Sequence, residues 1–307
     1  MKNKVVAVVG PTASGKSALA VDIAKKYGGE VVSADSMQIY RKMDIGTAKI
    51  RDTEGVPHHL IDIVDPSETY TLSDYLSDAD RTVKDILSRG KLPVMAGGTG
   101  LYISSFIDNI QLTDAETDEE YREYLKNFAR ENGAAALYSL LEKTDPESYK
   151  TLHVNDEKRI IRALEFFHTT GMTITEHNAL SRAVPSPYDF YIIGITFSDR
   201  QKLYDRIDRR VDMMIEEGFI EEVESLDFEK LSKTARQAIG YRQIFGYLAG
   251  TMSLEDAVED IKRESRRYAK RQLTWFRRDK RINWLCADGN ELNCELFATS
   301  MEKFLDI

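Results

Sequence analysis

Residues 10–17 carry the clearest chemical pattern in the chain, Gly-Pro-Thr-Ala-Ser-Gly-Lys-Ser. The run matches G-x-x-x-x-G-K-[ST], in which glycines let backbone N–H groups wrap a phosphate and the lysine adds a mobile positive charge. The Ser17 hydroxyl is suited to a Mg²⁺ ion that also binds the phosphates, so we predict Mg²⁺ as the cofactor and Ser17 as its protein ligand. The predicted phosphate-binding residues are Gly10, Pro11, Thr12, Ala13, Ser14, Gly15, Lys16 and Ser17.

Asp35 is the second candidate for chemistry, because it closes the strand-like run VVSAD at 31–35. A phosphate loop specifies only a polyphosphate ligand, and nucleotide chemistry usually adds an acidic residue at the end of a second strand to help hold Mg²⁺. From the residues alone, Asp35 is therefore either a metal helper or a base.

A glycine-rich turn, GGTG at 97–100, follows the apolar run PVMA at 93–96. Open α/β sheets bind ligands at the carboxyl ends of their strands, where this turn would lie. The alternative is a tight turn from strand to helix without ligand contact.

Strands and helices alternate around these candidates. Residues 5–9 predict a strand that leads into the glycine loop, and 17–27 show helical spacing. Further strands are predicted at 30–34 and 92–96, with a helix at 72–87 between them. Such alternation is typical of a parallel sheet flanked by helices, so the predicted fold class is α/β with a core like that of phosphate-loop NTPases.

A helical stretch interrupts this core. The pattern is helical from 118 to 170, and Pro185-Ser186-Pro187 then precedes a strand predicted at 190–197. The predicted domains are a first core segment at 1–112, a helical insertion that contacts RNA at 113–186, and the completion of the core at 187–307. Later elements are predicted as helices at 199–218 and 254–276 and a last strand at 282–286.

Charge is distributed unevenly along the 307 residues. The net charge of -9 argues against a nucleic-acid partner, but residues 261–281 contain ten Lys or Arg against two acids. Aromatic residues Tyr268, Trp275 and Phe276 lie among these charges, which favours a nucleic-acid surface over a merely solvated helix. For any single arginine in the cluster, the solvated helix face remains the alternative.

Other features set limits on the function. The two cysteines have seven residues between them and match no zinc pattern, so we expect a reduced chain without zinc. The N-terminus has no cleavable apolar segment, and no apolar run approaches the roughly 18 residues that span a bilayer. We therefore expect a cytoplasmic protein with no membrane partner, acting as a monomer.

Eight sequence blocks resemble one family. In chain order they are SADSMQIYR at 33–41, DIGTAK at 44–49, PHHLID at 57–62, GGTGLY at 97–102, HVNDEKRIIRALE at 153–165, RIDRRV at 206–211, IGYRQ at 239–243 and AKRQLTWFR at 269–277. Together with the phosphate loop, this ordered set resembles the tRNA dimethylallyltransferase family over nearly the whole chain. The resemblance implies a phosphate-loop core with a helical insertion.

The same resemblance implies an activity and its residues. Family members transfer a dimethylallyl group from dimethylallyl diphosphate to N6 of the adenine next to the anticodon, position 37 of tRNA, which enters a channel through the protein. By matching positions, Asp35 looks like the general base, and Thr12 and Arg210 look like catalytic groups near the diphosphate. Positions that look like contacts to the tRNA anticodon stem-loop are Asp35, Ser36, Met37, Gln38, Thr99, Arg159, Ile160, Ile161, Arg162 and Ala163. From the basic cluster we add Arg266, Arg267, Lys270 and Arg271.

The chain departs from the family at two points. Val154 stands where many members have proline, and the C-terminal zinc finger of eukaryotic members has no counterpart here, which implies a bacterial-type enzyme. Three other interpretations remain open: a small-molecule kinase with the same loop, an isopentenyltransferase acting on free adenine nucleotides, and a non-catalytic RNA-binding switch.

Overall fold

The computed structural model describes residues 2–112, 117–288, 292 and 294–307, which form two compact units. Unit 1 joins Met1–Ile107 to Pro187–Ile307, and unit 2 is Asp108–Ser186. Unit 2 thus ends where the predicted insertion ends. It begins before the predicted start at residue 113, and that start lies outside the described residues.

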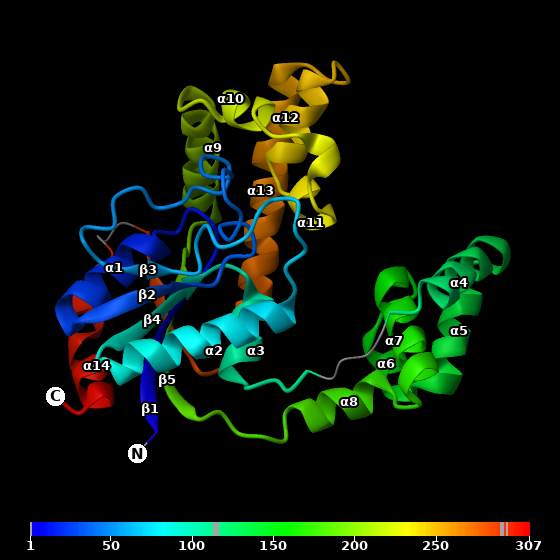
Figure 1. Ribbon diagram of the computed structural model, residues 1–307, viewed down its shortest axis with the longest axis horizontal. Coiled ribbons are helices and arrows are strands. Elements are labelled where there is room, and N and C mark those ends of the chain that lie inside the picture. The colour runs from blue at the N-terminus through cyan, green and yellow to red at the C-terminus, as the bar shows by residue number, and fades with distance from the viewer. Residues whose placement is uncertain (1, 113–116, 289–291, 293) are drawn as a thin grey trace. The chain divides into compact units, whose positions relative to one another are not determined.

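Unit 1 is built on a six-stranded sheet in which every pair of neighbouring strands is parallel (Figure 1). The strand order is β3-β2-β4-β1-β5-β6. The central strand is apolar and buried from Val5 to Val9, as expected for a parallel sheet covered on both faces. This confirms the predicted α/β fold. The strands are β1 Asn3–Val9, β2 Gly29–Ser33, β3 His58–His59, β4 Leu92–Gly97, β5 Tyr188–Thr196 and β6 Ile282–Cys286.

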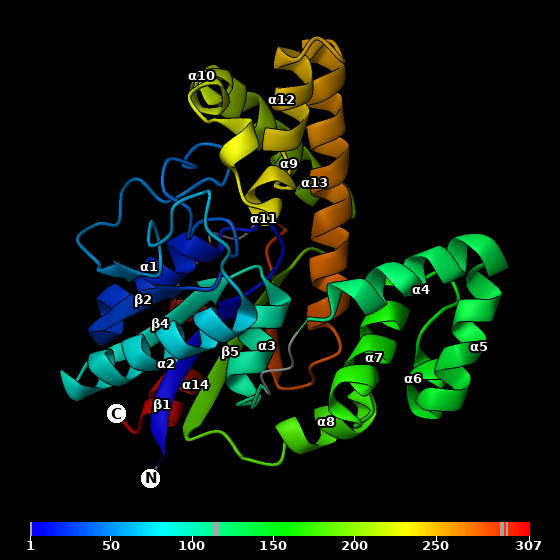
Figure 2. The same cartoon turned by 45° about the vertical axis from the view of Figure 1, so that its right-hand side comes forward.

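Helices cover both faces of the sheet. The apolar side chains of α2 (Leu72–Ser88) and α3 (Gly100–Ile107) pack on one face, and the two helices lie side by side in both views (Figures 1 and 2). The other face is covered by α1 (Lys16–Tyr27) and α14 (Ala298–Leu305). Thr71 caps α2 in a reciprocal box with Asp74, which fixes where that helix begins.

A helical layer beyond the sheet edge completes unit 1. Its members enclose a cluster that includes Phe219, Tyr241 and Ile261 and also takes in Ile39 and Tyr40 from the segment after β2. Figure 2 shows α12 alongside the long helix α13. The helices are α9 Arg200–Glu216, α10 Phe219–Glu224, α11 Lys233–Arg236, α12 Tyr241–Leu248 and α13 Leu254–Phe276. Short 3-10 helices are η1 Phe228–Lys230 and η2 Cys294–Phe297.

Unit 2 is helical throughout its regular elements, as its periodicity predicted, and has its own apolar core around Leu125, Leu137 and Leu164. The fully buried Glu165 is neutralised within this unit by Arg122 and Arg162. Its helices are α4 Glu119–Asn132, α5 Ala134–Thr144, α6 Pro146–Thr151, α7 Glu157–Thr170 and α8 Ile174–Ser181. Across both units, none of the described helices is long and apolar enough to cross a membrane.

Candidate active site

The sheet topology brings three loops to one edge. The phosphate loop follows β1, Asp35 stands two residues after β2, and Thr99 stands two residues after β4. Because β4 lies between β1 and β2 and all three run parallel, these loops leave the sheet side by side at its carboxyl edge. The candidate chemistry of the sequence is therefore assembled in one place.

The phosphate loop has the backbone conformation that its glycines predict. Gly15 has φ 93°, where a side chain would be strained, and the next residue, Lys16, begins α1. The Lys16 ammonium donates to the Pro11 carbonyl oxygen at 2.7 Å. Burial, with the charge of Arg210, lowers the pKa of Lys16 to about 8 although Asp35 opposes the shift. The site thus contains a buried lysine whose charged form is favoured when an anion binds beside it.

Gln272 of α13 links the phosphate loop to the loop after β4. Its Oε1 accepts from the Thr12 N–H at 2.8 Å, and its Nε2 donates to the Gly98 carbonyl at 2.8 Å. A Cβ on Gly98 would lie 2.1 Å from this Nε2, and one on Gly97 would lie 2.1 Å from the Ala34 carbonyl oxygen. Close packing explains both glycines, and Gly97 also lines the cavity beside the phosphate loop, so the segment is a tight turn that borders a candidate ligand site. The importance of Gln272 was missed in the sequence, where it appeared only within the AKRQLTWFR block.

Two arginines of α9 reach the phosphate loop. Arg210 donates from Nη1 to the Thr12 Oγ1 at 2.8 Å, and Arg206 donates from Nε to the Ala13 carbonyl at 2.9 Å. Burial lowers the pKa of Arg210, and the charge of Asp35 opposes this effect. The structure thus brings together Thr12 and Arg210, which the sequence paired only by resemblance, and adds Arg206, which it missed.

The carboxylate of Asp35 is held by the chain that follows it. Its Oδ1 accepts from the N–H groups of Met37 at 2.9 Å and Gln38 at 3.4 Å. Thr99, predicted to contact tRNA, accepts from the Ser36 N–H at 3.0 Å and so supports this segment from the neighbouring loop. These bonds fix one carboxylate oxygen while the other remains available for chemistry.

Two cavities meet at Asp35. The phosphate cavity, about 150 Å³, is lined by the phosphate loop with Asp35 and Gln272. The apolar cavity, about 300 Å³, has Ile207, Met214 and Phe219 in its wall, with Ser36 and Met37 beside them. The residues that line both cavities are Thr12, Ala13, Asp35, Thr47, Arg210 and Tyr268.

Tyr268 stands at this junction and was recognised in the sequence only as an aromatic among basic residues. Burial, reinforced by the charge of Asp35, raises the pKa of its phenol to about 12. The phenol therefore stays protonated and neutral near pH 7, where it is a potential hydrogen-bond donor at the junction.

Two serine hydroxyl groups in the phosphate cavity are suited to bind ligands, one an anion and the other a cation. The Ser14 Oγ is buried and has no hydrogen-bond partner among the described residues, so it can donate to a bound phosphate oxygen. The Ser17 hydroxyl is exposed in the same cavity. No group of three or more His, Cys, Asp or Glu within the described ranges could hold a metal ion by itself. A Mg²⁺ ion fits here only in its usual way, with most ligands from phosphate and water.

The predicted basic contacts on α13 differ in accessibility. Arg266 donates from Nη1 to both carboxylate oxygens of Asp208 on α9 at 2.6 Å, so it ties two helices together. Arg267 is exposed, and its guanidinium bonds Glu264 of its own helix at 2.6 Å. Lys270 and Arg271 are also exposed. The RNA-binding prediction therefore rests mainly on the exposed Arg267, Lys270 and Arg271, while the less exposed Arg266 also joins two helices.

A third cavity lies between the start of α9 and the end of α13. This basic cavity, about 330 Å³, presents Arg200, Lys270 and Arg277 around apolar side chains that include Leu203 and Leu273. The sequence singled out Lys270 and counted Arg277 in the basic cluster, but it missed Arg200, which the fold brings to them from 70 positions away.

The residues of unit 2 that were predicted to contact tRNA include both buried and exposed side chains. Ile160, Ile161 and Ala163 are 0%, 5% and 1% exposed in the core of that unit, so their side chains cannot touch RNA in this structure. Arg159 is exposed, and Arg162 is half-buried and donates to Glu165 at 3.3 Å. The prediction for this segment is therefore confined to Arg159 and Arg162.

Comparison with known proteins gives one consistent result. The sequence model of the IPP transferase family matches residues 38–279, and that of isopentenyl transferase matches 3–56. The tRNA dimethylallyltransferase of Caldanaerobacter subterraneus is 49% identical over 302 residues, covering 96% of each chain. That of Halalkalibacterium halodurans is 48% identical over 288 residues, covering 92% of this chain and 91% of the relative.

Solved structures of transferases that act on tRNA also superpose on this chain. A tRNA isopentenylpyrophosphate transferase from Bacillus halodurans superposes with a TM-score of 0.72 at 44% identity, covering 99% of this chain and 96% of the other. A eukaryotic dimethylallyltransferase acting on tRNA gives a TM-score of 0.83 at 28% identity, covering 99% of this chain and 80% of the other.

Proposed function

The chain belongs to the IPP transferase family, and we propose that it uses the junction at Asp35 to transfer a dimethylallyl group from dimethylallyl diphosphate to N6 of the adenine next to the anticodon of tRNA. The reaction breaks the bond between the allylic carbon and the diphosphate oxygen and forms a bond from that carbon to N6. The N6 proton is removed and diphosphate leaves with the electron pair.

One observation carries this proposal: a polar cavity lined by the phosphate loop and an apolar cavity share the wall residues Asp35, Thr12 and Arg210. A diphosphate bound to the loop would place its five-carbon tail at the mouth of the apolar cavity. The reacting carbon would then lie at the junction, and the apolar walls would keep water away from it.

The departing diphosphate is stabilised by groups that are already in place. Lys16 supplies positive charge, as does Arg210, which is held beside the loop by its bond to Thr12. The Thr12 hydroxyl accepts that bond, so its own hydrogen is left to donate to the leaving oxygen. Ser17 and the diphosphate would hold Mg²⁺, which supplies further charge neutralisation for the leaving group when bound.

Asp35 is the base that removes the proton from N6. Its Oδ1 is occupied by the backbone of Met37 and Gln38, so its second oxygen is the one that can take the proton from N6. An exocyclic amine is a weak nucleophile, and a fixed base about 2.6–3.2 Å away in the complex is sufficient to assist it.

The tRNA partner is engaged by the exposed cations. We propose that Arg267, Lys270 and Arg271 contact the backbone of the anticodon stem-loop, where an adenine leaves its stack at a cost of a few kcal/mol. The basic cavity provides further phosphate contacts through Arg200 and Arg277. The chain needs no second copy for any of these contacts, and we propose that it acts as a monomer.

A single assay tests the function. The protein is incubated with radiolabelled dimethylallyl diphosphate and Mg²⁺ in separate reactions containing unmodified tRNA, free AMP or ATP. We expect label in tRNA only. Label in AMP would make the chain an isopentenyltransferase of free nucleotides, and phosphoryl transfer from ATP without prenyl transfer would make it a kinase.

A further inference from the structure

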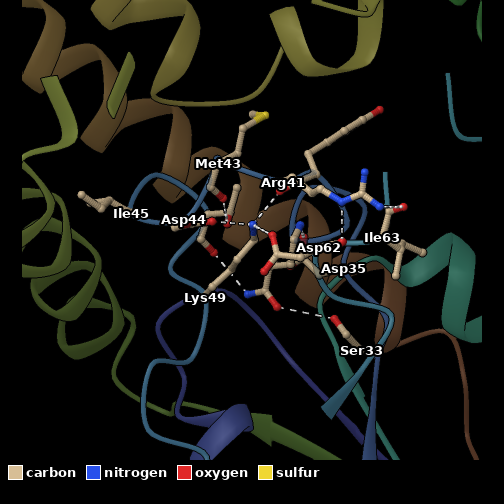
Figure 3. Close-up of polar contacts among 12 residues, drawn as sticks. Ser33, Asp35, Arg41, Met43, Asp44, Ile45, Lys49, Asp62 and Ile63 are labelled. Atoms are coloured by element: carbon tan, nitrogen blue, oxygen red, sulfur yellow. Dashed lines mark hydrogen bonds and ion pairs between the residues drawn. The ribbon is translucent and has the colours of Figure 1, made fainter. Parts of the chain in front are cut away.

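A buried lysine outside both cavities holds the segment that follows Asp35. This segment, residues 36–49, is called the Asp35 loop. Lys49 at its end has a side chain that is only 6% exposed, and its ammonium donates to the Tyr40 carbonyl at 2.5 Å and to Asp44 Oδ1 at 2.6 Å. Its third hydrogen bond goes to Asp62. Figure 3 shows the ammonium between the carboxylates of Asp44 and Asp62.

These contacts reinforce the backbone hydrogen bonds that already join the Asp35 loop to residues 62–64. A buried ammonium loses its hydration, and two carboxylates and a carbonyl compensate it with all three of its hydrogens used. Two residues beside the contacts, Ala48 with φ 48° and Asp62 with φ 57°, have left-handed backbone without being glycine. Such conformations persist where surrounding contacts enforce them, and Lys49 supplies some of those contacts together with backbone hydrogen bonds.

A short path of hydrogen bonds runs from Lys49 to the base. The carbonyls of Thr47 and Ala48, just before Lys49, accept from the Gln38 side-chain amide at 3.2 and 3.4 Å. The backbone N–H of Gln38 in turn donates to Asp35 Oδ1. The position of Lys49 therefore determines where Gln38 lies, and Gln38 helps to orient Asp35.

The Asp35 loop has a second anchor, which meets the Lys49 network only at Asp44. Glu222 of α10 accepts from three consecutive backbone N–H groups, those of Asp44, Ile45 and Gly46, at 2.7–3.1 Å. It also accepts from the Tyr241 hydroxyl at 2.5 Å. Because this anchor does not involve Lys49, loss of the lysine should loosen the loop without detaching it.

We propose that Lys49 is a positioning residue for the transfer step: by locking the Asp35 loop, it fixes the carboxylate of Asp35 at the junction of the two cavities. The inference deepens the function proposed above and rests on it. Lys49 lines neither cavity, so its effect on the reaction passes through Gln38 and Asp35.

The test compares Lys49→Met with Lys42→Met. Lys42 is an exposed lysine in the same loop and lines neither cavity, so the control makes the same substitution without touching the network. We expect Lys49→Met to lower kcat about 10- to 100-fold, because small misplacement of a catalytic group has effects of this size. The KM for dimethylallyl diphosphate should stay within about threefold, since the phosphate loop is unaltered. Lys49→Arg should recover a large part of kcat, whereas Lys42→Met should match the wild type.

Hydrogen exchange gives a readout that does not depend on activity. Amides within 37–48 should exchange faster in Lys49→Met than in Lys42→Met, with no change in α1. Unaltered kcat in Lys49→Met, or unaltered exchange in the loop, would overturn the proposal. If this variant fails to fold, Asp62→Asn weakens the same network more gently and must show a smaller fall in kcat in the same direction. A wild-type protein that transfers no label to tRNA would refute the proposed function, while the exchange result would still decide whether Lys49 orders the loop.

Discussion

Arg210 and Thr12 are joined by a hydrogen bond of 2.8 Å between guanidinium Nη1 and hydroxyl Oγ1, although 198 positions separate them in the chain. The bond assigns the two residues complementary tasks. Arg210 supplies charge and orients the hydroxyl, and the hydroxyl keeps its hydrogen for an oxygen of the ligand.

Removal of this arginine should slow diphosphate departure. We expect Arg210→Ala to lower kcat about 10²- to 10³-fold, the size of effect seen when one donor to a developing oxyanion is removed. Arg209→Ala is the matched control, because Arg209 is the exposed neighbour on the same helix and lines neither cavity at the junction. Steady-state kinetics on tRNA measure both, and equal rates in the two variants would contradict the role given to Arg210.

Replacement of the base should affect turnover more than binding. Asp35→Asn keeps shape and polarity but cannot accept the proton, so we expect a loss of about 10²- to 10⁴-fold in kcat with tRNA affinity within a few-fold of wild type. Single-turnover assays across a Mg²⁺ titration provide the measurement. Recovery of near wild-type turnover at high Mg²⁺ would identify Asp35 as a metal helper instead.

Diphosphate affinity should depend on pH through Lys16. Its pKa of about 8 lies below the ordinary 10.5, so the free protein loses this charge as pH rises through 8. A bound diphosphate favours the charged form, and binding above pH 8 must therefore take up a proton. We expect the association constant to be insensitive to this group below about pH 8 and to fall by up to about tenfold per pH unit above it.

Calorimetric titration with pyrophosphate between about pH 7 and 9.5 measures this dependence. Lys16→Arg, which stays charged, should bind without the decline, and Lys16→Met should bind weakly at every pH. A decline of equal slope in Lys16→Arg would assign the titration to another group.

The salt dependence of tRNA binding should report on the basic cavity. Neutralising Arg200, Lys270 and Arg277 to glutamine should weaken tRNA affinity and flatten the plot of log K against log salt by roughly 0.7–0.9 for each phosphate that is no longer neutralised. Filter binding at several salt concentrations measures the slope, and an unchanged slope would mean that this cavity faces solvent in the complex. The matched control removes the same charge at three exposed lysines elsewhere: Lys2, Lys42 and Lys91.

Acid stability should depend on Glu30 of β2. Its side chain is 7% exposed, accepts from Arg89 and bonds His59 Nε2 at 2.7 Å, and the bonds from Arg89 are the main cause that lowers its pKa to about 2. Because its folded pKa lies below its ordinary value of 4.5, its contribution is complete above pH 4.5 and declines as pH falls toward 2.

Glu30→Gln should therefore lower the free energy of unfolding at pH 7 by about 1.5–3 kcal/mol, toward the lower end because Arg89 is partly exposed to solvent. The variant should also lose less stability than the wild type between about pH 5 and 2. Urea unfolding at several pH values measures both effects, and parallel pH profiles for the two proteins would rule out this role.

Much of the core could be predicted because its signals are local. The run from β1 through the glycine loop to α1 is contiguous, and the periodicity of α13 and the apolar run of β6 predicted their bounds at 254–276 and 282–286 without error. The two-residue strand β3 was missed because a pair of histidines has no detectable alternation. The short helices α10, α11 and α12 were missed because four to eight residues hardly define a helical period.

Site residues that belong to a sequence motif were predicted, whereas those that only the fold brings to the site were missed. Asp35, Thr12 and Arg210 entered through blocks of sequence, and the structure brings them together. Gln272 bonds backbone groups of two other loops, and Lys49 bonds Tyr40, Asp44 and Asp62, which are contacts that no local pattern reveals. Ile160 lies inside a matched block and was predicted to contact tRNA, but its side chain is buried in the core of unit 2.

The bond from the Thr12 amide to Gln272 has a consequence for biosynthesis. Synthesis runs from the N-terminal side, so the phosphate loop is made before α13, and the partner of that amide lies 260 positions later. A nascent chain thus carries the motif before the helix that braces it has been made. A chain that ends before α13 lacks this brace, so the phosphate loop gains its contact to Gln272 only after α13 has been translated.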